Sequence, residues 1–549
     1  MVEQVLMPQP ESGPTKQDRQ TDTALHALAR AVAVVPDQVF LDFSGDLYTY
    51  AETERLATRF AHELIRLGLE PGQTVATLLD NSMDQVVSWL AINKAGGLWV
   101  PLNTAYRGDF LRHPIDDSLA TIVVADTRYI GDVAAISADL PHLRLVLRRG
   151  PATGEAPACA VPIEALDDHR GTDDTPIPIS AQPGDLSMLI YTSGTTGVSK
   201  GCMISYNFIL NQGRQSNQAV PPLPGDVMYT PLPLFHVAAI DVALSGLLAQ
   251  ARVAISERFS VSGFWAEIER SGATQARLMA SIFPLVANAP DTPEMHRCRG
   301  QLRSVVGAPF PPALRKVWQD RFGVEFTDGH NYGLSEGVRL AMSRFGDDSM
   351  PEDCCGRIAD DYEVVILDED DRILPDGEMG EIAFRPRKPH IMFVGYWRRP
   401  EATAEVWRNL WMHTGDYGRI ANGYLFFVDR KKDYLRSRGE NISSFEVETA
   451  FLNHPALSEV AAHAADDGIN EDCLKITAVL REGHALSEEE LCRWALDHVP
   501  HFAVPRYIEF RDELPRTPTN KVLKFQLRKQ GVTAGTWDRE AAGITVRRR

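Results

Sequence analysis

A run of small and hydroxylated residues that ends in a lysine is the part of this sequence best suited to chemistry. The run is Tyr191-Thr192-Ser193-Gly194-Thr195-Thr196-Gly197-Val198-Ser199-Lys200-Gly201, and it directly follows the apolar segment 186–190. Its glycines let backbone N–H groups turn inward, its hydroxyls can donate to phosphate oxygens, and Lys200 adds a positive charge. An apolar strand that leads into such a loop predicts a cradle for a polyphosphate.

The spacing of this loop differs from that of the common nucleotide-binding P-loop. The P-loop has four residues between its glycines and a lysine directly after the second glycine. Here two residues separate Gly194 from Gly197, and Lys200 comes later. The alternative is a solvated Ser/Gly linker, which is disfavoured because linkers rarely follow a strand of buried type.

Further candidate groups follow at the ends of predicted strands. The strand from residue 227 leads into a proline-bounded loop that ends at His236, for which a packed loop residue is the simpler interpretation. The strand 302–306 ends in the small turn Gly307-Ala308-Pro309, where bare backbone can lie against a planar ring. A turn without any ligand is the alternative for this second site.

The segment 328–336 offers several kinds of nucleotide contact within a few residues. Asn331 has an amide for a base edge, Tyr332 an aromatic face for stacking, Ser335 a hydroxyl for a phosphate and Glu336 a carboxylate for Mg²⁺, with Gly333 between them. Farther on, Thr414-Gly415-Asp416 places a carboxylate on a tight turn.

The order of these motifs resembles that of the adenylate-forming superfamily, which comprises acyl-CoA ligases, peptide-synthetase adenylation domains and luciferases. The segment 438–448, Arg-Gly-Glu-Asn-Ile-Ser-Ser-Phe-Glu-Val-Glu, is similar to the bacterial carnitine/crotonobetaine-CoA ligase branch, whose actinobacterial relatives include ligases for steroid and terpenoid acids. The resemblance covers residues 25 to 530 and implies ATP, Mg²⁺ and coenzyme A as cofactors.

The resemblance also implies a role for individual residues. The catalytic lysine corresponds to Lys521, which follows Asn520 where the family usually has glycine, and Asn tolerates a left-handed backbone best after Gly. Lys200 and His236 are the other expected catalytic groups, and Glu336 is both catalytic and the metal ligand. The residues expected to bind ATP or CoA are Thr192, Ser193, Gly194, Thr195, Thr196, Gly197, Gly307, Ala308, Pro309, Asn331, Tyr332, Gly333, Ser335, Asp416, Arg430, Lys432, Arg436, Arg438 and Gly439.

The alternation of apolar strands and amphipathic helices predicts an α/β fold with parallel sheets. The local patterns also predict a helix from Ala24 to Val35, a short hairpin around Gly45 and a helix opened by a capping box of Ser487 and Glu490. By resemblance, two α/β sheet subdomains and a small β-barrel form a large N-terminal domain, followed by a small mobile α+β domain. We expect a flexible tail over 1–20, the N-terminal domain over 21–431 and the C-terminal domain over 432–549, with Lys432 at the pivot. Residues 151–184 are expected to form a surface excursion.

Composition limits the class of protein. The chain has 549 residues, 44% of them hydrophobic, and a net charge of −18, which argues against a nucleic-acid partner. The seven cysteines lack CxxC spacing, which favours a reducing cytoplasm, and no segment is long and apolar enough to be transmembrane. The partners expected are a small-molecule carboxylic acid, ATP and CoA, with a homodimer left open.

The predicted function is therefore an ATP-dependent acyl-CoA ligase that proceeds through an acyl-adenylate and releases AMP and pyrophosphate. Small residues at Ala238, Ala239, Gly246, Ala308 and Gly333 favour a bulky, hydrophobic acid. The alternatives are a protein active in only one half-reaction, adenylation or thioesterification, and a non-catalytic protein that binds an adenylate.

Overall fold

The computed structural model divides the chain into two compact units. It describes residues 22–546 apart from gaps at 153, 155–156, 193–198, 346, 348, 431–434, 438–439, 443, 467–471, 500–502 and 517–521. The first unit consists of Met1–Tyr191, Gly201–Ser349 and Pro386–Pro400, and the second of Thr192–Lys200, Met350–Arg385 and Glu401–Arg549. The sequence-based boundary between residues 431 and 432 stays a prediction, and the predicted tail lies outside the described residues.

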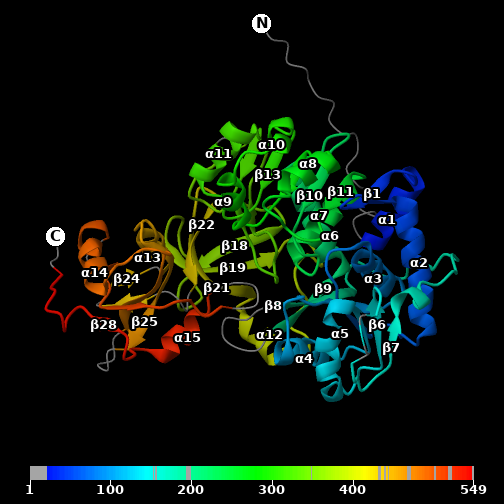
Figure 1. Cartoon of the computed structure of the whole chain (residues 1–549), viewed down its shortest axis with the longest axis horizontal. Helices are drawn as coiled ribbons and strands as arrows, with labels where there is room; N and C mark the ends of the chain where they lie inside the picture. The colour runs from blue at the N-terminus through cyan, green and yellow to red at the C-terminus, as the bar shows by residue number, and fades with distance from the viewer. Residues whose placement is uncertain are drawn as a thin grey trace, which may run out of the picture. The chain divides into compact units, whose positions relative to one another are not determined.

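The first sheet of the first unit has seven strands in the order β7-β6-β5-β3-β4-β8-β9. Strands β6, β7, β8 and β9 are labelled in Figure 1. Its strands are β3 (Thr74–Leu78), β4 (Leu98–Pro101), β5 (Ile122–Asp126), β6 (Leu145–Arg149), β7 (Ile163–Ala165), β8 (Leu186–Thr192) and β9 (Lys200–Ser205). Strands β3 to β8 pair in parallel. The predicted surface excursion over 151–184 therefore also supplies β7, which adds an edge strand to the sheet.

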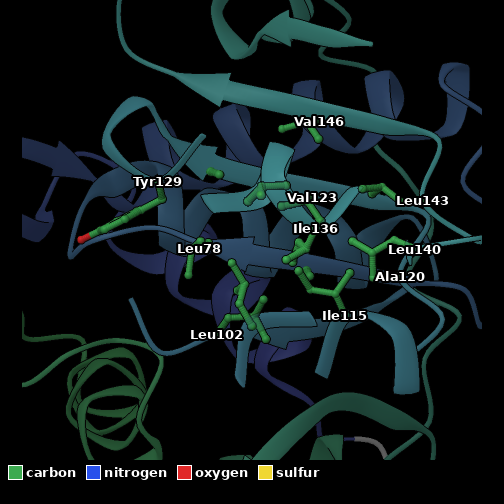
Figure 2. Packing of buried hydrophobic residues seen from close by; sticks show 14 of the residues in the cluster. Leu78, Leu102, Ile115, Ala120, Val123, Tyr129, Ile136, Leu140, Leu143 and Val146 are labelled. Atoms are coloured by element: carbon green, nitrogen blue, oxygen red, sulfur yellow. The ribbon is translucent and has the colours of Figure 1, made fainter. Parts of the chain in front are cut away.

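Apolar side chains on these strands pack against the accompanying helices. The helices are α2 (Tyr50–Arg66), α3 (Met83–Lys94), α4 (Gly108–Asp117) and α5 (Ile130–Ile136). Figure 2 shows Leu78, Val123 and Val146, from three neighbouring strands, in one buried cluster with Ile115 of α4 and Ile136 of α5. Strands that are apolar on both faces are typical of a parallel sheet covered by helices.

The second sheet also has seven strands, in the order β14-β13-β12-β10-β11-β1-β2. Its strands are β1 (Val39–Phe43), β2 (Asp46–Thr49), β10 (Val227–Thr230), β11 (Arg252–Ile255), β12 (Gln275–Arg277), β13 (Ser304–Val306) and β14 (Phe326–Asp328). The predicted hairpin at Gly45 is confirmed as the antiparallel pair β1–β2, and the remaining pairs are parallel. The associated helices are α1 (Ala24–Val34), α6 (Tyr206–Ala219), α7 (Val237–Ala249), α8 (Phe264–Ser271), α9 (Ile282–Ala287), α10 (Pro293–Arg297) and α11 (Pro312–Phe322).

The first unit also contains a pair of short strands, and the second unit contains a sheet of antiparallel strands. In the first unit β15 (Asn331–Tyr332) pairs with β16 (Ala341–Met342). The second unit contains β17 (Arg357–Ile358), β18 (Tyr362–Leu367), β19 (Met379–Pro386), β20 (Trp407–Arg408), β21 (Trp411–Ala421) and β22 (Tyr424–Arg430), together with most of α12 (Pro400–Val406). Four of these strands follow one another in the sheet as β22-β21-β19-β18.

The rest of the second unit is a small α+β arrangement. Strands β23 (Leu435–Ser437) and β24 (Glu440–Ile442) form a ribbon, and β25 (Leu457–Asp466), β26 (Asp472–Leu480), β27 (Tyr507–Phe510) and β28 (Trp537–Asp538) form a sheet. Its helices are α13 (Ser444–Leu452), α14 (Glu488–His498) and α15 (Lys524–Gln530). Ser487 and Glu490 form the predicted capping box of α14. The predicted α/β class, with a separate C-terminal sheet, is confirmed.

Candidate functional site

Several predicted site residues lie outside the described part of the chain. They are Ser193, Gly194, Thr195, Thr196 and Gly197 of the cradle, together with Lys432, Arg438, Gly439 and Lys521. Arg436 lies on β23, where its backbone pairs with that of Asn441 on β24. Their roles stay predictions from the sequence.

The strands on either side of the cradle are described. Thr192 ends β8 and Lys200 begins β9, and the Thr192 hydroxyl donates to the Lys200 carbonyl oxygen at 3.5 Å. Next to them in sequence, Gly201 packs against the Tyr191 ring, because a Cβ atom at Gly201 would lie 3.1 Å from Tyr191 Cζ. The Tyr191 hydroxyl in turn donates to Asp117 Oδ2 at 2.9 Å. Strands β8 and β9 therefore flank the predicted cradle in the sequence.

The turn Gly307-Ala308-Pro309 directly follows β13, at the carboxyl end of the second sheet. The Gly307 N–H donates to the Asp328 carbonyl oxygen at 3.1 Å, and Asp328 is the last residue of β14. A Cβ atom at Gly307 would lie 2.1 Å from the Leu278 carbonyl oxygen, so only glycine fits between the two neighbouring strand ends. Ala308 is half-buried and Pro309 is exposed, which leaves this side of the turn accessible.

The segment from Asp328 to Glu336 turns back on itself between β14 and β16. Asp328 and His330 are buried, with His330 Nδ1 2.6 Å from Asp328 Oδ1, and the same oxygen accepts from the His330 backbone N–H. Asn331 is exposed, whereas Tyr332 is buried. A Cβ atom at Gly333 would lie 1.2 Å from the Val338 carbonyl oxygen, so the glycine is required by the loop itself. Ser335 follows it, half-buried.

Glu336 is held by a residue that the sequence did not indicate. The Tyr396 hydroxyl donates to Glu336 Oε1 at 2.6 Å, and the Phe393 N–H donates to the Glu336 carbonyl oxygen at 3.0 Å. Burial and the negative charge of Glu336 raise the pKa of Tyr396 well above its usual value, so the tyrosine stays a hydrogen-bond donor. Because 60 residues separate the two partners, no local pattern could have revealed the contact.

His236 immediately precedes α7. Its carbonyl oxygen accepts from the Ala239 N–H at 3.0 Å, and its side chain is exposed at the start of the helix. Since His236 follows β10 and Gly307 follows β13, both lie at the carboxyl edge of the same sheet. Ligands of open α/β sheets bind at this edge.

In the second unit, Asp416 and Arg430 lie opposite each other on the antiparallel strands β21 and β22. Arg430 Nε is 3.9 Å from Asp416 Oδ1. The Asp416 N–H donates to the Thr414 hydroxyl at 3.1 Å, and Gly415 between them has a φ of 72°, a left-handed conformation that favours glycine. The predicted tight turn is wrong: Thr414, Gly415 and Asp416 lie inside strand β21, where its pairing with β19 is irregular, and the strand presents a carboxylate beside an arginine.

A buried network next to the predicted pivot was also missed. Asp429 on β22 accepts from the Ser444 hydroxyl at 2.8 Å and from the Phe445 N–H at 3.2 Å, at the start of α13. Lys524 of α15 donates to the Ser444 hydroxyl at 2.6 Å and contacts Glu448 at 2.7 Å. In this conformation the network ties the end of β22 to α13 and α15.

The comparison with protein families gives two matches. Residues 28–397 match the model of the AMP-binding enzyme family, and residues 446–521 match the AMP-binding enzyme C-terminal domain. The first match alone covers more than half of the chain.

Similar curated proteins are acid–CoA ligases. The chain is 27% identical over 501 residues to the crotonobetaine/carnitine–CoA ligase of Salmonella arizonae, covering 89% of this chain and 95% of that protein. It is 29% identical over 528 residues to a long-chain-fatty-acid–CoA ligase of Escherichia coli, covering 91% and 93%.

Solved structures show the same fold. ATP-bound MatB from Rhodopseudomonas palustris superposes with a TM-score of 0.80 at 26% identity, covering 93% of this chain and 99% of that one. The O-succinylbenzoate coenzyme A synthetase of Bacillus subtilis in complex with AMP gives a TM-score of 0.79 at 23% identity, covering 92% and 98%. The predicted membership of the adenylate-forming superfamily is thus confirmed, and the chain belongs to the AMP-binding enzyme family.

Proposed function

We propose that this protein is an ATP-dependent acyl-CoA ligase that works in two displacements. In the first, the carboxylate of the acid attacks the α-phosphorus of ATP, and the bond to pyrophosphate breaks. In the second, the CoA thiol loses its proton, the thiolate attacks the acyl carbon, and AMP leaves with the bonding electron pair. The observation that carries the proposal is the match of both family models along a chain whose described motifs lie at strand ends.

Most of the acceleration in the first displacement would come from positioning and electrostatics, because the reacting groups are already charged. Lys521 would bridge the carboxylate and the α-phosphate, while the cradle and Lys200 would hold the leaving pyrophosphate. Asp416 would accept the ribose hydroxyls, and His236 would border the acid. Removing one such donor typically lowers the rate about a hundredfold or more.

The residues present fit Mg²⁺. No group of three or more His, Cys, Asp or Glu side chains in the described part of the chain could hold a metal ion by itself. Mg²⁺ commonly binds through one carboxylate together with substrate phosphates and water, so a single Glu336 suffices. A bound Mg²⁺ would neutralise phosphate charge. The hydrogen bond from Tyr396 fixes the orientation of the Glu336 carboxylate and makes Tyr396 a positioning residue.

The second displacement is proposed to require a movement of the C-terminal part about Lys432. One site cannot both hold Lys521 over the α-phosphate and open a path for pantetheine past Gly439. The network of Asp429, Ser444 and Lys524 would stabilise one of the two conformations. The alternatives remain a protein active in one half-reaction and a non-catalytic adenylate-binding protein.

The size argument for a bulky acid loses two of its five residues. Gly246 packs against β11, since a Cβ atom there would lie 2.1 Å from Val253 Cγ2, and Gly333 is small because of its own loop. Ala238 is exposed at the start of α7, and Ala308 is half-buried. A bulky, hydrophobic body of the acid therefore remains a proposal supported by Ala238, Ala239 and Ala308.

The cellular setting is also a proposal. No described helix is long and apolar enough to cross a membrane. We propose a reducing cytoplasm from the spacing of the seven cysteines, which all lie among the described residues and form no disulfide bond there.

The test separates the two half-reactions. AMP and pyrophosphate formation from ATP and acid is measured apart from thioester formation on a supplied acyl-adenylate. Lys521→Ala should fail only in the first assay, because the thiol route remains, and Gly439→Leu only in the second, because a branched side chain blocks the pantetheine path. Glu336→Ala should abolish pyrophosphate release, with Tyr396→Phe about tenfold slower. Loss of both half-reactions in either single variant that remains folded by circular dichroism would refute the alternation, and normal ATP–pyrophosphate exchange by Glu336→Ala would refute the metal assignment.

A further inference from the structure

Three buried polar side chains and one half-buried arginine meet at the carboxyl end of β12 in the first unit. They are Ser216 on α6, Asp241 on α7, Arg277 at the end of β12 and Arg339 in the loop between β15 and β16; we call them the arginine cluster. Arg277 Nη1 donates to Asp241 Oδ2 at 2.8 Å, and Arg339 Nη2 donates to the same oxygen at 2.6 Å. The Ser216 hydroxyl donates to Asp241 at 2.6 Å and accepts from both guanidinium groups.

This cluster holds an excess of positive charge away from water. The side chains of Arg277, Arg339 and Asp241 are only 9%, 16% and 3% exposed, so two guanidinium groups share one carboxylate. Burial lowers the pKa of Arg277, and the attraction of Asp241 is opposed by the charge of Arg339. An uncompensated buried charge is costly, and here it occurs in a chain whose net charge is −18.

The segments that carry the arginine cluster also carry, or pair with, residues of the candidate site. Arg277 is the register partner of Val306, the residue before Gly307, and Val306 is the partner of Asp328. Asp241 follows His236 by five residues on α7, a rise of about 7.5 Å along the helix axis. Arg339 follows Glu336 by three residues in the same loop.

The topology of the sheet supports a ligand at this position. Strand β10 lies between β11 and β12, so the chain leaves β10 toward β11 and later returns on its other side. Open α/β sheets bind ligands at such a reversal, outside the carboxyl ends of the strands. Arg277, as the last residue of β12, lies at that edge.

A neighbouring amide holds the backbone of Arg339 in place. Gln215 Nε2 donates to the Arg339 carbonyl oxygen at 3.1 Å and so fixes the backbone of Arg339. The Gln215 side chain is buried, and its Oε1 atom has no hydrogen-bond partner within the described residues. Buried amide oxygens normally meet a donor, so a water molecule or a hydroxyl is expected at Gln215 Oε1.

We propose that the arginine cluster binds a second anionic group, such as a second carboxylate, at the far end of the acid that the enzyme activates. This inference rests on the proposed ligase function and names its substrate class. The reacting carboxylate would lie near His236, and the second anion would reach Arg339, the more exposed of the two arginines. A second carboxylate would neutralise the cluster, whereas an uncharged end would leave one positive charge uncompensated. The acid can be bulky between its two ends.

The test uses matched acids that differ only at the far end. The full-length protein is given dicarboxylic acids from succinate to suberate, their monomethyl esters and the monocarboxylic acids of equal length. ATP–pyrophosphate exchange gives kcat and KM, and calorimetry gives binding in the presence of a non-hydrolysable ATP analogue. At the best length we expect kcat/KM for the diacid to exceed that for its monomethyl ester roughly tenfold to a hundredfold, mostly through KM.

Arg339→Met should remove this preference while leaving the monocarboxylic acids nearly unchanged, and Arg339→Lys should keep part of it. Arg303→Met is the matched control, since Arg303 is also 16% exposed and pairs with the buried Asp226 at 2.7 Å, but precedes β13 at the opposite edge. It should retain the preference.

The outcomes distinguish this inference from the proposed function. Exchange with monocarboxylic acids as good as with diacids, or an equal loss for all acids in Arg339→Met, would overturn the inference and leave the ligase function intact. Diacid binding that depends on Arg339 without any exchange would support the inference and refute the ligase function. If no acid binds or reacts, both are wrong.

Discussion

Two groups of charged side chains, one on each seven-stranded sheet of the first unit, differ in how well their positive and negative charges compensate each other. On the first sheet Arg149 donates to Asp84 Oδ2 at 2.7 Å and to Asp126 Oδ1 at 2.8 Å, and Arg170 also pairs with Asp84. We call these four residues the balanced cluster, because two arginines meet two aspartates. The arginine cluster on the second sheet also has two arginines, Arg277 and Arg339, but only one aspartate, Asp241.

The two environments shift the pKa of an arginine side chain in opposite directions. Burial by itself would lower the pKa of Arg149, but the hydrogen bonds from its guanidinium to Asp126 and Asp84 raise it above its usual value. For Arg277, burial and the charge of Arg339 prevail, and the pKa is lowered. The uncompensated charge is also the deeper one, since Arg149 is 33% exposed and Arg277 only 9%. In a balanced cluster the folded chain itself compensates the buried charges. An unbalanced cluster on the segments of a candidate site indicates a ligand that supplies the missing charge.

The largest difference between the clusters is expected when an aspartate is neutralised. Asp241→Asn leaves two buried guanidinium groups without a counter-charge and should lower the free energy of unfolding by about 3–5 kcal/mol. Asp126→Asn leaves Arg149 its partner Asp84 and should cost about 1–3 kcal/mol. Urea unfolding of both variants, followed by tryptophan fluorescence, measures the two values. Insoluble Asp241→Asn beside soluble Asp126→Asn agrees with the prediction; equal costs contradict it.

When an arginine is removed, we expect a smaller difference in the free energy of unfolding, with the balanced cluster losing more stability than the arginine cluster. Arg149→Met leaves Asp126 without its arginine, while Asp84 keeps Arg170, and should destabilise the protein by about 2–3 kcal/mol. Arg339→Met removes one of two like charges that share Asp241, so its free energy of unfolding should stay within about 1 kcal/mol of the wild type. The same unfolding assay decides between them. A cost for Arg339→Met as large as that for Arg149→Met would make the arginine cluster a structural network like the balanced one.

Much of the fold could be predicted from the sequence because its signals are local. The helix from Ala24, the hairpin at Gly45 and the capping box at Ser487 all depend on residues close together in the chain, and each is present. The motif order led to the right family for the same reason. The roles of the predicted site residues are not tested by their positions, because Lys521 and most of the cradle lie outside the described residues.

The contacts that the sequence did not reveal join distant segments. Tyr396 and Glu336 are 60 residues apart, and Arg339 and Asp241 are 98 residues apart. A signal was nevertheless present: Asp241 interrupts the apolar run from Val237 to Leu248, and Arg277 ends a short buried strand. A charge inside an apolar segment requires a partner, but the sequence alone does not say which one.

The smallest expected effect is on the stability of the folded protein at low pH, to which the two clusters should contribute differently. Burial by itself would raise the pKa of Asp84, but hydrogen bonds from Arg170 and Arg149 and their charges lower it below its usual value of 3.8. A carboxylate whose pKa is lowered by folding contributes stability that is complete above its unfolded pKa and is lost as the pH falls through the folded value. The wild type should therefore lose part of the contribution of the balanced cluster below about pH 4.

Asp84→Asn, which cannot titrate, should be less stable at pH 7 but should lose less stability than the wild type between about pH 5 and pH 3. In Arg277→Met the wild-type loss should persist, because this substitution leaves the balanced cluster intact and an arginine does not titrate between about pH 5 and pH 3. Urea unfolding at several pH values measures these losses, and an Asp84→Asn curve parallel to that of the wild type would show that the balanced cluster does not contribute to acid sensitivity.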